Sequence, residues 1–193
     1  MEPADILPEI DAAIIATPHA THFPLADTLL RAGKHVLLEK PLALTTEDCG
    51  RIAAAARAGK ALAMPAHVRR LFPAAPWVRR TLAEGRLGRV TSVTWREGHP
   101  YAWPLLTGFM FAPPDEGGGV LLDTGPHVLD LLHHWFPGPA EVVSCAHNGG
   151  TGAESEIRLH ATFGGTPSEI HLSRLRSLGD TCTLHGTTAD LTV

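Results

Sequence analysis

Short apolar runs alternate with helical patterns over residues 11–64, and this alternation constrains the fold more than any other feature. Residues 11–16, 35–38 and 61–64 are short and apolar, as is typical of buried parallel strands. Between them, residues 19–32 and 46–58 carry apolar side chains at helical spacing. Gly33 and Gly59 predict the two helix ends, and Thr45 or Thr46 predicts the start of the second helix. Strands and helices that alternate with short connections predict a parallel, doubly wound sheet.

The pattern changes after residue 64. A helix is expected at 74–84 and a strand at 89–95, followed by a loop over 98–114 that is rich in Pro, Gly and aromatic residues. A helix led by three glycines follows. Five strands are then expected at 141–147, 156–163, 169–174, 181–185 and 191–193. We therefore expect an α/β domain over residues 1–88, and an α+β domain with a mainly antiparallel, meander-like sheet over residues 89–193.

Composition excludes several classes of partner. The 193 residues carry a formal net charge of −4 with acids and bases interleaved, so no basic stripe offers a nucleic-acid footprint. No apolar run reaches the roughly 18 residues that a membrane span needs, and no signal-peptide core is visible. Cys49, Cys145 and Cys182 are widely spaced, which indicates reduced thiols and a cytoplasmic protein.

The glycine-led helix carries ionisable residues on one stripe. Asp123, His127 and Asp130 recur at i, i+4 and i+7, and the opposite stripe is apolar. This stripe is either a solvated face with capping acids or a functional site. Pro126 must lie in the first turn or kink the helix, and Asp123 would then be an N-terminal residue.

A metal site on this helix is not expected. Asp123 and His134 would be about 16 Å apart along the axis, which is too far for one ion. Instead, we interpret His133 and His134 as cations that interact favourably with the C-terminal end of the helix dipole.

Lys40 is the second candidate for chemistry. It follows a predicted parallel strand at its carboxyl end, where open α/β sheets bind their ligands, and Pro41 stiffens the turn after it. Partial burial would suit the lysine to proton transfer at neutral pH. The alternative interpretation is a neutral pair with the adjacent carboxylate of Glu39.

Several spaced motifs together resemble the Gfo/Idh/MocA family of nicotinamide-dependent oxidoreductases. They occur in order along the chain: DAAIIATP with His22, AGKHVLLEKP ending at Pro41, Arg69-Arg70 with Pro73, Gly85-Arg86-Leu87-Gly88, and the segment from Gly117 to Asp130. The resemblance extends from about Asp11 to Val193, which is nearly the whole chain. Motifs in a fixed order are far more specific than any one of them.

The resemblance implies a dehydrogenase of a sugar, polyol or related hydroxy compound that uses NAD or NADP. It implies that His127 accepts the alcohol proton, that Asp123 orients the imidazole, and that Lys40 hydrogen-bonds the reacting oxygen or shares the proton relay. No metal is implied, and we expect a homo-oligomer formed through the C-terminal sheet. The residues implied to contact the cofactor are Thr17, Pro18, His22, Glu39, Lys40 and Arg70.

The chain also departs from the family pattern, because no G-x-G-x-x-G motif occurs in it. We expect the first half of the nucleotide-binding sheet and the last strands of the second sheet to be missing. The alternative function is therefore a truncated, inactive fragment or interaction subunit that binds no dinucleotide. We also expect an apolar strand edge, Ile14-Ile15 beside Val36-Leu37, to be exposed.

Overall fold

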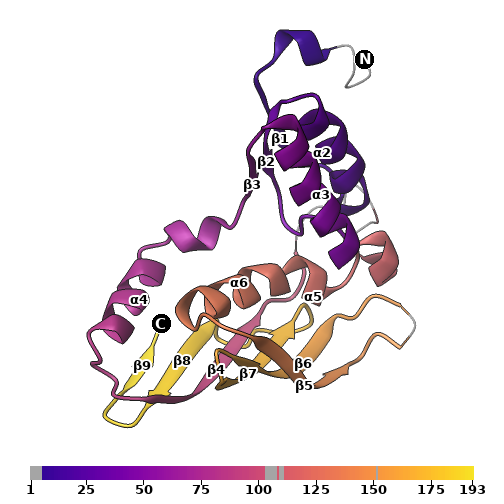
Figure 1. Ribbon diagram of the computed structural model, residues 1–193. Coiled ribbons are helices and arrows are strands. Elements are labelled where there is room, and N and C mark those ends of the chain that lie inside the picture. Colours follow the sequence, from indigo (N-terminus) through magenta and orange to yellow (C-terminus); the bar gives the residue numbers. More distant parts are fainter. Residues whose placement is uncertain (1–5, 103–107, 109–110, 151) are drawn as a thin grey trace. The chain divides into compact units, whose positions relative to one another are not determined.

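The computed structural model describes residues 6–102, 108, 111–150 and 152–193, and it divides into two compact units (Figure 1). The first unit extends to His67 and includes Asp115–Gly117; the second contains Val68–Pro114 and Gly118–Val193. The division thus falls earlier than the position near Gly88 expected from the sequence, because the helical segments after His67 contact helix α6 (Gly125–Trp135) of the second unit. Most of residues 103–110 in the expected loop, including Trp103, lie outside the described residues.

The first unit is a three-stranded parallel sheet with two packed helices. Its strands lie in the order β1-β2-β3, and α2 packs against α3. Ile15, Val36 and Leu38 from the sheet form the core with Ala26, Leu30 and Ile52 from the helices. The parallel α/β architecture predicted from the sequence is confirmed. The elements are η1 (Leu7–Glu9), β1 (Ala12–Ile15), η2 (His19–Thr21), α2 (His22–Arg31), β2 (His35–Leu38), α3 (Thr46–Gly59) and β3 (Ala63–Pro65).

The ends of α3 are set by one expected and one unexpected residue. Thr45 caps the helix as predicted, because its Oγ1 accepts a hydrogen bond from the Asp48 backbone N–H at 3.1 Å. The left-handed residue that ends the helix is Lys60, with φ of 52°, so the prediction of Gly59 as the stop was one residue early. Gly59 is needed for packing instead: a Cβ there would lie 1.8 Å from the Leu30 carbonyl oxygen.

In the described sheet β1 is an edge strand paired only with β2, as expected, but the exposed apolar surface includes Ile14 and not Ile15. Ile14 is 74% exposed and Met64 is 62% exposed, whereas Ile15 and Val36 are buried at 3% and 2%. Successive strand residues point to opposite faces, so only every second apolar side chain meets the helices. Neighbours in sequence therefore differ completely in burial.

The second unit contains a six-stranded sheet in the order β5-β6-β7-β4-β8-β9. The sheet is mainly antiparallel, as predicted, but it is not a meander: β4 lies between β7 and β8 and runs parallel to β7. Alternation of apolar residues predicts a strand and a buried face but does not encode which strand lies beside it. The strands are β4 (Val90–Gly98), β5 (Ala140–His147), β6 (Glu156–Phe163), β7 (Thr166–Ser173), β8 (Thr181–Gly186) and β9 (Asp190–Thr192).

Helix α6 covers the sheet of the second unit (Figure 1). Val128, Leu132 and Trp135 are buried in one core with residues of the sheet, and the rings of Trp135 and Trp95 stack with centroids 6.1 Å apart. Within the described ranges, no helix is long and apolar enough to cross a membrane. The helical elements are η3 (Val68–Leu71), α4 (Ala74–Ala83), α5 (Val120–Asp123) and α6 (Gly125–Trp135), with η5 (Pro114–Glu116) before α5.

The two adjacent isoleucines of β1 give a direct test of the first unit. Ile15→Ala removes a fully buried side chain and is expected to lower the free energy of unfolding by about 2–5 kcal/mol. Ile14→Ala removes an exposed side chain and should change it by less than about 0.5 kcal/mol. Urea unfolding of both variants measures this difference, and equal losses would show that the assigned faces of β1 are wrong.

Candidate functional site

The predicted catalytic helix is two helices in the structure. Helix α5 ends at Asp123 and α6 begins at Gly125, so Asp123 does not share a helix with His127 and Asp130. The cause is Pro126, which has no N–H to donate and lies in the first turn of α6. The His127 N–H instead bonds to the Thr124 carbonyl oxygen at 3.2 Å. The single-stripe prediction was wrong for Asp123.

The glycines before α5 allow close backbone approaches. A Cβ on Gly118 would lie 1.8 Å from the Ala112 carbonyl oxygen. Gly119 has φ of 102°, and a Cβ there would lie 2.4 Å from the carboxylate of the buried residue Glu154. That carboxylate accepts a hydrogen bond from the Leu121 N–H at 2.7 Å, which satisfies a backbone donor in the first turn of α5. The glycines thus fix where α5 starts.

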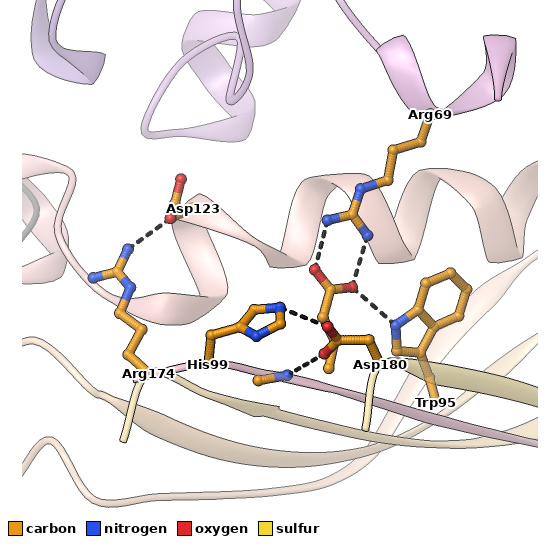
Figure 2. A network of polar contacts seen from close by, with 8 residues as sticks. Arg69, Trp95, His99, Asp123, Arg174 and Asp180 are labelled. Carbon is orange, nitrogen blue, oxygen red and sulfur yellow. Dashed lines mark hydrogen bonds and ion pairs between the residues drawn. The ribbon is translucent and has the colours of Figure 1, made fainter. Parts of the chain in front are cut away.

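Asp123 is paired with Arg174, a residue that sequence reasoning missed. Arg174 Nη2 donates to Asp123 Oδ2 at 2.9 Å (Figure 2). The guanidinium lies 5.7 Å from the ring centre of Tyr101 and 6.0 Å from that of Phe111. Arg174 is only 8% exposed and follows directly after β7. A basic residue at the end of an apolar strand was the one available sequence signal.

Asp130 is paired with Arg70, which the resemblance had implied as a cofactor contact. Arg70 Nε and Nη2 donate to the two carboxylate oxygens at 2.8 and 2.6 Å. The hydrogen bond to Asp130 raises the pKa of Arg70. Two parallel bonds fix both side chains. The described contact of Arg70 therefore lies within the second unit.

His134 differs from its expected role as a cation at the helix end. Its pKa is lowered, first by burial and then by the positive charges of Arg70 and Arg79. Proximity to these two arginines was not visible in the sequence. In the part of the chain that the structure describes, no three His, Cys, Asp or Glu side chains are grouped as metal ligands.

His127 lines a cavity of about 530 Å³ in the second unit. This volume is in the range of small-molecule sites, roughly 300–1,000 Å³. The apolar lining includes Phe72, Leu131 and Trp135. Cys182 also contributes, but burial raises its pKa to about 12, so it is no nucleophile at neutral pH. The polar lining residues other than His127 include Arg69, Glu97, His99, Asp180 and Thr181.

Arg69 and Glu97 form a two-point ion pair on this lining (Figure 2). Arg69 Nη1 donates to Glu97 Oε2 at 2.7 Å and Nη2 donates to Oε1 at 2.5 Å. The Trp95 indole N–H donates to the same Oε2 at 3.2 Å. Three donors thus engage the Glu97 carboxylate and hold it in place.

His99 and Asp180 form a second pair on the same lining. His99 Nε2 lies 2.5 Å from Asp180 Oδ2, and the Gly98 N–H donates to Oδ1 at 2.9 Å. Asp180 has φ of 43°, which is uncommon for a residue other than glycine, although aspartate tolerates it better than most. This backbone conformation and the Gly98 bond hold the carboxylate in place. Neither residue was singled out from the sequence.

In the first unit, the implied cofactor contacts Thr17, Pro18, Glu39 and Lys40 follow the carboxyl ends of β1 and β2. Thr17 and Pro18 are exposed, whereas Glu39 and Lys40 are half-buried. The Lys40 N–H donates to Glu39 Oε2 at 3.2 Å. These residues occupy the sheet edge at which open parallel sheets bind ligands.

His22 has a different place from these four residues. Its side chain is fully buried, and its ring joins the segments after β1 and β2: Nε2 lies 2.8 Å from the Thr17 carbonyl oxygen and Nδ1 lies 2.7 Å from that of Pro41. A ring with no exposed surface acts by holding these two segments together. Its implied contact with a cofactor is therefore better assigned to the residues that it positions.

Two family models match the chain. Residues 1–67 match the model described as "Oxidoreductase family, NAD-binding Rossmann fold", and residues 76–192 match the model described as "GFO/IDH/MocA C-terminal domain". Together with the parallel sheet and the mixed second sheet, these matches define an oxidoreductase-type protein. The chain belongs to the GFO/IDH/MocA family.

Relatives and solved structures agree with this assignment. The chain is 40% identical to 1,5-anhydro-D-fructose reductase of Ensifer adhaerens over 76% of this chain and 44% of the relative. It is 36% identical to inositol 2-dehydrogenase 2 of Saccharopolyspora erythraea over 72% of this chain and 38% of the relative. The 3-ketoreductase KijD10 of Actinomadura kijaniata, solved with NADP, has 26% identity and a TM-score of 0.86, covering 100% of this chain and 59% of that one. The chain spans less than half the length of these two curated relatives.

The Asp123–Arg174 pair predicts a measurable cost. Asp123→Asn removes the charge facing a buried guanidinium and is expected to lower the free energy of unfolding by about 1–3 kcal/mol. Asp27→Asn is the matched control, because Asp27 pairs with the exposed Arg31 and its loss should be smaller than that of Asp123→Asn. Chemical denaturation followed by circular dichroism measures both, and a smaller loss for Asp123→Asn would contradict the pairing.

Proposed function

We propose that this chain forms the nicotinamide-facing and substrate-binding parts of an NAD(P)-dependent dehydrogenase acting on a sugar, polyol or related hydroxy compound. The observation that carries the proposal is the position of His127 on a cavity of small-molecule size with an apolar wall and polar groups. Membership of the GFO/IDH/MocA family supports redox chemistry, and the named reductase and dehydrogenase relatives support a hydroxylated substrate.

His127 is proposed to be the general base for alcohol oxidation. An imidazole titrates near neutral pH and can take the hydroxyl proton while the hydride leaves the same carbon. Asp123 is a weaker candidate for this step, because its carboxylate is already engaged by Arg174. We assign it to orientation and charge near the reacting group. Lys40 is proposed to hydrogen-bond the reacting oxygen or share the relay, as the family resemblance implies.

The first unit fits the nicotinamide end of a dinucleotide. Its parallel strands end in polar and exposed groups at Thr17, Glu39 and Lys40, and His22 holds the two segments together. When bound, the nicotinamide accepts or supplies the hydride. No G-x-G-x-x-G motif is present to bind the pyrophosphate, so we expect the 193-residue chain alone to bind NAD(P)H weakly.

That missing motif favours a second candidate function, an interaction subunit or inactive fragment that binds no dinucleotide. Calorimetric titration of the chain with NADH and NADPH separates the two functions. Saturable binding supports the dehydrogenase, and a dissociation constant in the micromolar range excludes the second candidate. No heat of binding up to millimolar concentrations would favour the second.

Variants of one helix test the role of His127. His127→Asn is expected to reduce kcat for alcohol oxidation by about 10²–10⁴-fold, because a general base is lost. His134→Asn, two turns along the same helix, is the control and should keep kcat within about twofold. Steady-state kinetics with NAD and NADP over a panel of polyols and sugars gives both values. Undiminished turnover in His127→Asn would rule out the assignment.

The homo-oligomer expected from the sequence stays a prediction. All eight residues of β5 are exposed, and Val142 and Val143 are 70% and 69% exposed, which supports self-association through this sheet. Sedimentation equilibrium tests it: Val143→Asp should shift an oligomer toward monomer, and an unchanged mass would exclude this surface.

A further inference from the structure

The charged side chains that line the His127 cavity differ in how fully each charge is neutralised by a partner. Arg69 is neutralised by Glu97 at two points, and the carboxylate of Asp180 faces only a histidine and a backbone N–H among its described partners. With the histidines taken as neutral, the side chains of the described lining include one cation, Arg69, and two anions, Glu97 and Asp180. An anionic ligand would therefore meet a net negative side-chain charge on the lining that the second unit provides.

The adjoining surface repeats this pattern. A smaller cavity of about 110 Å³ shares Glu97 and His99 with the first and is also lined by Asp123 and Arg174. Its arginine is paired with Asp123, so it adds no uncompensated positive charge among the described residues. A carboxylate or phosphate group that approached either arginine would share it with a carboxylate already bound there, so the ligand's charge would be repelled by that carboxylate.

Neutral hydroxyl groups meet a better match. The Arg69 guanidinium has five N–H groups, and Glu97 engages one on each terminal nitrogen, so it can still donate to a hydroxyl oxygen. Asp180 is held in place by the Gly98 N–H and can accept from a hydroxyl. Each hydroxyl both donates and accepts, so a ring with several of them satisfies both kinds of group.

We propose that the cavity selects a neutral, multiply hydroxylated ring over a carboxylated or phosphorylated one, and that Glu97, by masking Arg69, determines this preference. The inference rests on the proposed function, which makes this cavity the substrate site, and adds that the substrate is uncharged. Asp180, paired with His99, is the acceptor for a substrate hydroxyl. Because Glu97 masks Arg69, replacing Glu97 alone should remove the preference for a neutral ring.

Ligand-observed saturation-transfer NMR on the 193-residue chain tests this inference with myo-inositol as the neutral probe and glucuronate as the anionic probe. The wild-type chain should bind myo-inositol at least about tenfold more tightly than glucuronate. Glu97→Gln keeps the shape of the side chain and unmasks Arg69, so glucuronate affinity should rise by about tenfold or more. Adding Arg69→Gln to that variant should abolish the gain.

Glu156→Gln is the matched control. Glu156 also accepts from an arginine, Arg176, and lies outside the described lining of both cavities, so its variant should keep the wild-type preference. Three results would overturn the inference. The wild-type chain could bind glucuronate as tightly as myo-inositol, it could bind neither probe, or Glu97→Gln could weaken the binding of both probes equally. NADH titration reads out the proposed function separately, so either can fail while the other stands.

Discussion

Burial of the apolar face of α6 against the six-stranded sheet is the constraint on which the second unit depends. Val128, Leu132 and Trp135 are buried with Trp95 and Leu184 in one continuous core. Because a helix has a fixed angular spacing, burying this face fixes the directions of the polar side chains between them. His127 and Asp130 are thereby directed away from the centre of the core. His127 lines the cavity, and Asp130 pairs with Arg70.

Paired charges then determine what the polar groups can do. Three carboxylates, Asp123, Glu97 and Asp130, each accept from an arginine. Such pairing holds these carboxylates in fixed positions, and His127 is our proposed general base on the cavity. It also leaves arginines that are fixed in position and largely neutralised. The proposed catalytic roles and the proposed charge selectivity therefore rest on the same set of contacts.

Local signals in the sequence predicted much of the fold. Apolar runs and glycines located the three parallel strands, and Thr45 capped α3 as expected. Pairing between distant segments, such as that of β4 with β7, could not be predicted. The left-handed residue at the end of α3 was also not predicted, because it is Lys60 and not Gly59. The composition of a strand does not specify its neighbour, and a close helix approach such as that at Gly59 is visible only in three dimensions.

The candidate site was predicted only in part, because its contacts also join residues that are distant in the sequence. Pro126 was recognised as a complication, and it does divide the helix after Asp123. Arg174, Glu97 and Asp180 were missed because each acts through a partner far away in sequence. Their shared signal is a charged residue within one position of the first or last residue of a strand. In a sheet whose strand ends line a cavity, such residues belong among the first candidates.

The central claim, that the His127 cavity binds the substrate, is tested most directly by following tryptophan indole resonances in ¹⁵N NMR during titration with myo-inositol. The Trp95 indole N–H is bonded to Glu97 on the cavity, whereas Trp77 is partly exposed and lies outside the described lining of this cavity. The account predicts a saturable shift of the Trp95 indole signal and an unchanged Trp77 signal. A shift at Trp77 alone, or none at Trp95 at saturating ligand, would contradict it.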